Sequence, residues 1–251
     1  MLHDLTHTLA APPPLDTRRH ALFLDLDGTL VEFAAHPEHV IASEDLRELL
    51  ARLSQAMNGA VALVTGRSIA SADAVLDGAL VHVAGLHGLE HRRGAHVERN
   101  IDDLTPITAA IADARALIAN GALDADVEEK GAAFALHYRR APQFADAVRR
   151  AAAELAQRHG LSLLEGKMVV ELKLGQRTKA DAVRDFMTTA PFMGRAPIAI
   201  GDDITDEDAF RAAAAAGGHA ILVGEHRVTA ARYTLPDTKA VFAWLAAGLT
   251  P

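Results

Sequence analysis

The sequence predicts an α/β protein with a doubly wound, Rossmann-like parallel-sheet core and an inserted α/β cap domain. Over the first hundred residues, short apolar runs alternate with helical segments, which is typical of a parallel sheet with helices on its faces. Near residue 100 the order changes to helix-strand-strand-helix-strand-strand, and the parallel pattern later resumes. We therefore expect a tail over residues 1–20, a core over residues 21–101 and 175–251, and a cap over residues 102–174.

The strands of the first half are predicted from apolar runs that end at turn-forming residues. These runs are residues 21–24, 61–64 and 81–84. The helix between the first two begins after Ser43, a good N-cap, carries leucines at i, i+3, i+4 and i+7, and ends at Asn58-Gly59. A second helix is expected over residues 68–76. Three consecutive prolines, residues 12–14, predict an extended segment within the tail.

The remaining elements follow from the same signals. In the cap we expect helices over residues 105–120 and 142–159, strands over residues 125–129 and 132–139, and a hairpin formed by residues 161–164 and 168–174. In the second half of the core we expect a helix capped by Thr178, strands over residues 197–200 and 219–223, a helix over residues 205–216 and a C-terminal helix that contains Trp244.

Composition excludes several classes of protein. Half of the 251 residues are hydrophobic and 23% are charged, which is ordinary for a globular chain. Cysteine is absent, so thiolate catalysis and cysteine-based zinc sites are excluded. The net charge is −8 without a basic stripe, and no apolar run is long enough to cross a bilayer. We expect a cytoplasmic monomer without a signal peptide that binds a small molecule, and neither nucleic acid nor a membrane.

The positive residues are distributed unevenly between the two types. The chain has 20 arginines and only 5 lysines. Because the two side chains are not chemically interchangeable, each lysine of an arginine-rich chain deserves a search for a specific role. The lysines are Lys130, Lys167, Lys173, Lys179 and Lys239.

Four polar motifs fall where the predicted parallel strands meet their helices. They are Asp25-Leu26-Asp27-Gly28-Thr29, Thr65-Gly66-Arg67, Lys179 and Gly201-Asp202-Asp203 with Asp206. Ligands of open α/β sheets bind at the carboxyl ends of the strands, so these motifs are expected to share one pocket. Each motif alone is also typical of an ordinary turn, helix cap or solvated helix residue. The four together, in this order, favour a functional site.

This set of side chains suits hydrolysis of a phosphate monoester. Asp25 is expected to attack phosphorus and form an aspartyl-phosphate, and Asp27 to act as general acid and then general base. A magnesium ion would relieve the repulsion between the two anions, held by carboxylate oxygens of Asp25 and Asp202 and the main-chain carbonyl of Asp27. Lys179 and the Thr65 hydroxyl would bind the remaining phosphoryl oxygens.

These motifs resemble those of the haloacid-dehalogenase-type phosphatases with an inserted cap, and among them the trehalose-6-phosphate phosphatase family. The resemblance covers roughly residues 21 to 247. Besides the four motifs, it rests on Ala84-Gly85-Leu86-His87-Gly88-Leu89-Glu90, Glu129-Lys130-Gly131, Phe134-Ala135-Leu136-His137-Tyr138-Arg139 and Gly166-Lys167-Met168-Val169-Val170-Glu171. One departure is the threonine at position 65, where many relatives have serine, and the hydroxyl is kept.

The resemblance implies magnesium-dependent hydrolysis of trehalose 6-phosphate and a role for each matching residue. Asp203 and Asp206 would orient Lys179 or a magnesium-bound water. The residues implied in sugar binding are Glu128, Lys130, Arg139, Lys167 and Glu171, and Arg67 and His87 would line the pocket. The cap would close over the substrate by hinges near Asp102 and Gly175.

Three alternatives remain open from the sequence. The substrate could be another sugar phosphate, such as sucrose phosphate or mannosyl-glycerate phosphate. A phospho-accepting receiver module also combines acids, a hydroxyl and a lysine on a parallel sheet, but the insert and the second carboxylate at Asp27 argue against it. A pure carbohydrate-binding module would not need the acidic motifs.

Overall fold

Two separate β-sheets organise the protein in the computed structural model, which describes residues 9–33, 40–99, 101, 103–166 and 168–250. The larger sheet has the order β12-β11-β10-β1-β2-β3-β4-β5. Its strands are β1 (His20–Leu24), β2 (Val61–Val64), β3 (His82–Gly85), β4 (Glu90–Arg93), β5 (His96–Arg99), β10 (Ala196–Gly201), β11 (His219–Val223) and β12 (Tyr233–Leu235). All neighbours from β12 to β3 are parallel, and β4 and β5 add an antiparallel edge.

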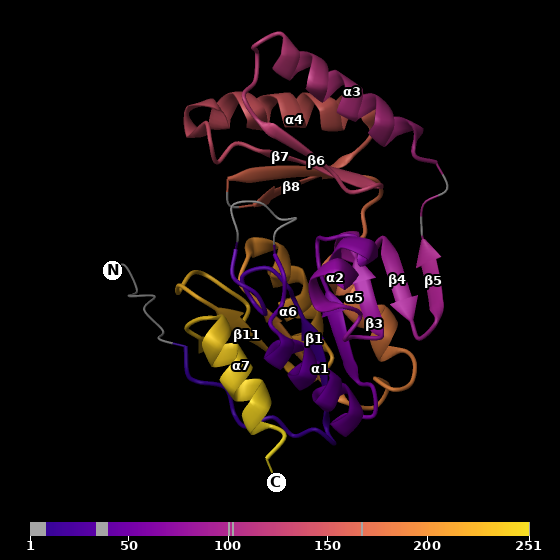
Figure 1. Cartoon of the computed structure of the whole chain (residues 1–251), viewed down its shortest axis with the longest axis vertical. Helices are drawn as coiled ribbons and strands as arrows, with labels where there is room; N and C mark the ends of the chain where they lie inside the picture. The colour runs from indigo at the N-terminus through magenta and orange to yellow at the C-terminus, as the bar shows by residue number, and fades with distance from the viewer. Residues whose placement is uncertain (1–8, 34–39, 100, 102, 167, 251) are drawn as a thin grey trace.

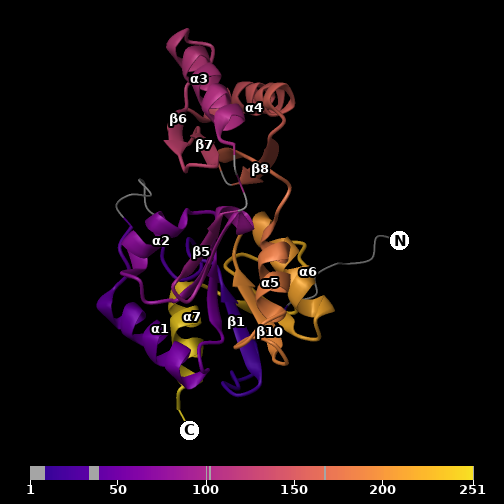
Figure 2. The same cartoon turned by 90° about the vertical axis from the view of Figure 1, so that its right-hand side faces the viewer.

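Helices cover both faces of this sheet, as Figure 2 shows for α1 and α7 on one side and α5 and α6 on the other. The core helices are α1 (Glu44–Ala56), α2 (Ile69–Leu76), α5 (Lys179–Met187), α6 (Glu207–Ala215) and α7 (Thr238–Ala247). Helix α1 begins where the Ser43 hydroxyl accepts a hydrogen bond from Leu46 N, and its leucine stripe is buried. The central strands, with helices on both faces, are apolar apart from His20 and His219 at the first positions of β1 and β11.

The position of β1 explains where a site can form. From β1 the chain continues outward through β2 and β3, then returns to β10 on the other side of β1 and continues to β11. The strand order therefore reverses between β1 and β10, which pair in parallel from His20–Ala196 to Leu24–Ile200. Loops leave such a switch point in opposite directions and open a crevice at the carboxyl ends of the strands.

The cap is a four-stranded antiparallel sheet with two helices on its outer face, as Figure 1 shows at the top of the molecule. Its elements are α3 (Thr105–Ala119), β6 (Asp126–Glu129), β7 (Ala133–His137), α4 (Ala145–His159), β8 (Ser162–Gly166) and β9 (Val169–Lys173). Alternate residues of β9, Val170 and Leu172, belong to the apolar cluster beneath the helices. Glu171 and Lys173 consequently lie on the opposite face, toward the core.

The predicted fold class is confirmed, and the missed elements have a common cause. The sequence analysis did not predict β4, β5 or β12. Strand β5 is exposed along its length and β4 is mostly charged, so neither shows the apolar runs or the alternation that identify strands. The cap boundaries proposed at residues 102 and 174 stay predictions.

Residues 9–19, expected to belong to a tail, lie against the core. Ala10 forms a β-bridge with Tyr233, and the Leu15 side chain is buried in the core cluster. The Trp244 indole donates a hydrogen bond to the carbonyl of Pro13. Among the described residues, no helix combines the length and apolarity that crossing a membrane requires.

Partly buried histidines of the core should make the fold sensitive to acid. Burial lowers the pKa of His20, His82, His91 and His219 below the ordinary value. The folded state therefore binds fewer protons than the unfolded chain below about pH 6.5, and stability should fall as the pH drops from 7 toward 5. Thermal unfolding followed across this range should show a falling midpoint, with a shallower slope for His82→Gln. The exposed His96→Gln is the control, and parallel slopes for all three proteins would contradict this origin.

Candidate active site

Two carboxylates meet at the switch point because two parallel strands end beside each other. Asp25 directly follows β1 and Asp202 directly follows β10, and Asp25 N donates to the carbonyl of Ile200 at 3.0 Å. Asp25 is buried, and the Thr29 hydroxyl lies 3.3 Å from Asp202 Oδ1 as its donor. The strand order therefore brings together two acids that are far apart in the sequence.

Lys179 reaches the same point from the first residue of α5. The Thr178 side chain caps this helix, and Asp181 completes a capping box with it. The Lys179 ammonium donates to Asp25 Oδ1 at 2.7 Å and to Asp206 Oδ1 at 2.6 Å. Burial alone would lower the pKa of Lys179, but the carboxylates of Asp206 and Asp25 outweigh it and raise that pKa above the ordinary value. The lysine is therefore a fixed positive charge.

The site still carries more negative than positive charge. Carboxylate oxygens of Asp25, Asp202 and Asp206, the acidic cluster, lie within 4.8 Å of one another. Burial and the neighbouring acids raise the pKa of Asp25 well above its ordinary value, even beside Lys179. Burial and Asp206 raise the pKa of Asp202 to about 7. A buried set of oxygen donors with uncompensated charge fits a hard divalent cation such as Mg²⁺.

Asp206 positions its neighbours more than it offers free oxygens. One oxygen accepts from Lys179, and the other accepts from the main-chain N–H groups of Asp202 and Asp203, each at 3.0 Å. Asp202 is less occupied, and it faces the turn at Gly28, where φ is +79°. A Cβ at position 28 would lie 2.4 Å from Asp202 Oδ2, so glycine is needed beside this carboxylate.

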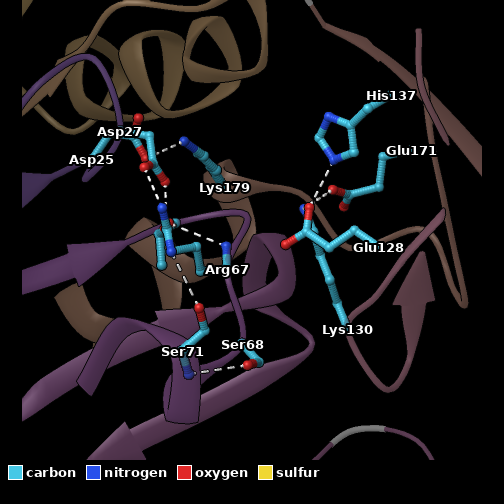
Figure 3. A network of polar contacts seen from close by, with 11 residues as sticks. Asp25, Asp27, Arg67, Ser68, Ser71, Glu128, Lys130, His137, Glu171 and Lys179 are labelled. Carbon is cyan, nitrogen blue, oxygen red and sulfur yellow. Dashed lines mark hydrogen bonds and ion pairs between the residues drawn. The ribbon is translucent and has the colours of Figure 1, made fainter. Parts of the chain in front are cut away.

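Asp27 and Arg67 form a two-point ion pair at the edge of the site. The Arg67 Nε and one terminal nitrogen each donate to a different Asp27 oxygen at 2.7 Å (Figure 3). The Thr65 hydroxyl is buried and accepts from Arg67 N at 3.2 Å. The sequence analysis assigned Asp27 to proton transfer and Arg67 to the pocket wall, without predicting that they pair.

A turn in left-handed conformation carries His87 from the core into the pocket. Leu86 and His87 have φ values of +49° and +54°, which non-glycine residues adopt rarely and at a cost. The turn is held by hydrogen bonds from Leu86 N to the Arg67 carbonyl and from His87 N to the Thr65 carbonyl. A Cβ at Gly66 would lie 2.8 Å from His87 Nε2, so the glycine makes room for this ring.

Opposite these core residues the cap presents four charged or polar side chains, the cap charge cluster: Glu128, Lys130, His137 and Glu171. Lys130 Nζ donates to Glu171 at 2.7 Å, and His137 Nε2 lies 2.8 Å from Glu128 (Figure 3). His87 Nε2 lies 3.0 Å from Glu171 Oε1 and joins cap to core. Burial alone would raise the pKa of Glu171, but Lys130 and His87 hold it well below its usual range.

A cavity of about 140 Å³ lies between the acidic cluster and the cap. Nine of the site residues singled out from sequence line it: Asp25, Asp27, Thr65, Arg67, His87, Lys130, Glu171, Lys179 and Asp203. Gly66, Gly166 and Val169 belong to the quoted motifs, whereas Phe33, Leu164, Glu165 and Thr205 were not singled out. The apolar members gave no signal in the sequence because ordinary core residues have the same composition.

Some residues singled out from sequence lie elsewhere. Arg139 is exposed and does not line the cavity. Asp203, in contrast, lines the cavity; its side chain accepts a hydrogen bond from Ile204 N and caps a short 3-10 helix, and Asp206 contacts Lys179. The roles of both acids in orienting Lys179 or a magnesium-bound water stay predictions. Lys167 lies outside the described residues. His137 was missed as a partner of Glu128, although a histidine on a cap strand two residues from Arg139 was visible in the sequence.

Comparison with known proteins agrees with this architecture. The family model for trehalose-phosphatase matches residues 23–239. The trehalose-6-phosphate phosphatase of Escherichia coli is 37% identical over 96% of this chain and 90% of its own length. A probable trehalose-phosphate phosphatase of Sinorhizobium fredii is 41% identical over 83% of this chain and 79% of its own length. A crystal structure of a trehalose-6-phosphate phosphatase related protein superposes with a TM-score of 0.74 at 26% identity, covering 90% of this chain and 95% of the other. The chain therefore belongs to the trehalose-phosphatase family of phosphatase enzymes.

Proposed function

We propose that this protein hydrolyses trehalose 6-phosphate to trehalose and inorganic phosphate, with Mg²⁺ and through an aspartyl-phosphate on Asp25. The observation that carries the proposal is the buried Asp25 carboxylate, fixed by Lys179 in a cavity that Lys130 and Glu171 of the cap charge cluster line from the cap side. The relative from Escherichia coli is named a trehalose-6-phosphate phosphatase, which supports the choice of sugar.

In the proposed reaction the Asp25 carboxylate attacks phosphorus, and the bond between phosphorus and the sugar oxygen breaks while Asp27 gives its proton to the departing oxygen. A water molecule then attacks phosphorus and gives a proton to Asp27. The bond between phosphorus and Asp25 breaks, which frees the Asp25 carboxylate and inorganic phosphate. Lys179 and the Thr65 hydroxyl bind the phosphoryl oxygens as charge spreads over them. The two hydrogen bonds from Arg67 fix the orientation of the Asp27 carboxyl group at the edge of the site.

The donors proposed for Mg²⁺ are the side chains of Asp25 and Asp202 and the main-chain carbonyl of Asp27. The ion would offset the negative charge that accumulates when the attacking carboxylate approaches the phosphate group of the substrate. The geometry supports this choice, because carboxylate oxygens of Asp25 and Asp202 lie close together at the carboxyl ends of β1 and β10. Asp206, whose oxygens are occupied by Lys179 and two main-chain N–H groups, would hold the lysine.

The sugar is proposed to bind under the cap. A disaccharide offers only hydroxyl and ether oxygens, so its binding groups must be donors and acceptors such as Glu128, Lys130, Glu171 and His87. Sugar binding by Arg139 and Lys167 stays a prediction from the family resemblance, as do the monomeric state and the cytoplasmic location.

Small-molecule pockets usually measure about 300–1,000 Å³. The cavity here is smaller, at about 140 Å³, so the cap would have to open and close at its flanking segments.

Phosphate release from a panel of sugar phosphates tests the proposal. The panel contains trehalose 6-phosphate, sucrose phosphate, mannosyl-glycerate phosphate and glucose 6-phosphate, each measured with Mg²⁺ and with excess EDTA. We expect trehalose 6-phosphate to have the highest kcat/KM and EDTA to abolish release from every compound. A higher kcat/KM for another sugar phosphate would identify that compound as the preferred substrate instead. Full activity in EDTA would overturn the role of the metal.

Replacing Lys130 with alanine should separate sugar binding from phosphate chemistry. The Lys130 ammonium contacts Glu171 in the cap and none of the acidic cluster. We expect kcat/KM for trehalose 6-phosphate to fall by about 10–100-fold, since a buried hydrogen-bonding group loses its partner. Hydrolysis of 4-nitrophenyl phosphate, which has no sugar, should stay within about twofold of the parent. Equal losses on both substrates would place Lys130 in the phosphate site instead.

A further inference from the structure

Lys173 is a buried lysine to which neither the phosphate site nor the sugar site gives a role. It ends β9, two residues after Glu171 and on the same face of the strand, and it is 1% exposed. Its ammonium donates to the main-chain carbonyl of Arg177. Among the described residues no carboxylate lies within ion-pair distance of it, and burial lowers its pKa. The carboxylates of Glu171 and Asp181 attract this charge from beyond ion-pair distance and do not outweigh its burial. A buried charge without a contacting counter-ion costs stability, so its retention calls for another explanation.

The carbonyl that Lys173 holds belongs to the segment that leads from the cap back to the core. Arg177 Nε in turn donates to the carbonyl of Gly88 at 2.6 Å, and a terminal nitrogen of Arg177 donates to Asp185 on α5. Gly88 closes the same turn that carries His87. The Lys173–Arg177 contact therefore ties the last strand of the cap to two elements of the core.

The hydrogen bond from Lys173 to the Arg177 carbonyl lies next to the start of α5, which carries Lys179. Thr178, the residue after Arg177, is the N-cap of α5, and Lys179 is its first residue. The position of the Lys179 ammonium depends on where α5 begins, because this side chain must span from the helix start to Asp25 and Asp206. Only four residues lie between Lys173 and Thr178, so a shift of the segment displaces the helix start directly.

We infer that Lys173 is a positioning residue: by holding the Arg177 carbonyl it fixes the start of α5 and so places Lys179 at Asp25. Glu171 and Lys173 share one face of β9, so the strand that contacts His87 under the cap also sets the geometry of the phosphate site. The inference rests on the proposed function for the role of Lys179. It differs from the role of Lys130, because it predicts an effect on every phosphate ester, with or without a sugar.

Lys173→Met is the main test, since methionine has similar length and no charge. We expect kcat to fall on the order of 100-fold for both trehalose 6-phosphate and 4-nitrophenyl phosphate, because a displacement of about 1 Å in a reacting group has that effect. KM for 4-nitrophenyl phosphate should stay within about threefold. Lys173→Arg, which keeps the charge and the donors, should restore most of the rate. Lys239→Met, at an exposed position on α7, is the matched control and should equal the parent.

Three kinetic outcomes would overturn the inference. They are a kcat for Lys173→Met within threefold of the parent, a loss confined to trehalose 6-phosphate, and a Lys173→Arg variant as slow as Lys173→Met. Arg177→Met keeps the carbonyl that Lys173 holds but removes the side-chain contacts that join this segment to Gly88 and Asp185, and it replaces Lys173→Met if that variant does not fold. Combined, the two substitutions should cost little more than either alone, whereas additive losses would contradict a shared tie.

Hydrogen–deuterium exchange provides a readout that does not depend on activity. In Lys173→Met the amides of residues 179–183 should exchange faster, while those of α4 in the cap keep the parent's rates. The thermal midpoint should not fall by more than a few degrees, because a buried charge is replaced by an apolar side chain. Unchanged amide exchange at the start of α5 would refute the inference, whether or not the parent is active on these substrates. Failure of the inference can therefore be distinguished from failure of the proposed function.

Discussion

Replacing Asp25 with asparagine should abolish phosphate release, with kcat reduced by at least about 10⁴-fold. Asparagine keeps the shape of the side chain but cannot form the bond to phosphorus. The same variant should be at least as stable as the parent in EDTA at pH 7–8. The pKa of Asp25 is raised in the folded state, so ionising it there costs stability, and stability is lost as the pH rises from the unfolded value toward the folded one.

Phosphate release and thermal unfolding of the same preparations measure both effects. Asp208→Asn is the matched control, because Asp208 is on α6, outside the cavity, and pairs only with the exposed Arg211 among the described residues. It should leave the rate and the midpoint unchanged. An Asp25→Asn variant that releases phosphate at the parent's rate would exclude this carboxylate as the nucleophile. A lower midpoint for it in EDTA would mean that the Lys179 contact outweighs the burial of its charge.

Replacing Lys179 with methionine should have the second large effect, on activity and on stability together. The rate should fall on the order of 10³-fold, as for loss of a donor to a phosphoryl or oxyanion group. Removing one partner of a buried ion pair typically destabilises by about 3–5 kcal/mol, and here the carboxylates of Asp25 and Asp206 would both lose their only lysine contact among the described residues. Chemical denaturation and phosphate release on one preparation measure both changes.

A second substitution distinguishes the two consequences of losing Lys179. Asp206→Asn in the Lys179→Met background removes one of the uncompensated charges and should recover a large part of the lost stability. It should not restore the rate, because no ammonium then faces the phosphate. Recovery of the rate would show that Lys179 serves only to neutralise Asp206, and an unchanged stability would show that the acidic cluster carries no unfavourable charge.

The core and the cap could be predicted from sequence because their packing requires periodic apolar residues. The leucine stripe of α1 and the apolar runs of β1 and β2 leave no other arrangement for burial. Strands β4 and β5 could not be predicted this way. Their side chains are mostly polar, and main-chain pairing of β4 with β3 and of β5 with β4, not apolar burial, holds them at the edge of the sheet.

The candidate site also has a part that the sequence predicts and a part that it does not. Asp25, Asp202 and Lys179 were predictable because each follows a strand or begins a helix at one edge of one sheet, and that placement alone makes them neighbours. The pairing of Asp27 with Arg67 depends on side-chain rotamers, and the contact between Lys173 and Arg177 depends on the path of an irregular segment. Neither leaves a periodic trace in the sequence. The roles assigned to the site residues stay predictions until variants are measured.

The internal pairing of the cap charge cluster has a consequence for selectivity. Lys130 and Glu171 satisfy each other, as do Glu128 and His137, so an arriving ligand exchanges existing hydrogen bonds and does not add new ones. The right ligand then gains little net free energy from these groups. A deoxy analogue, in contrast, would separate the pairs and leave a charged group without a replacement partner, a loss that can exceed 10³-fold. The roof of the cavity is thus better suited to rejecting near matches than to holding its ligand tightly.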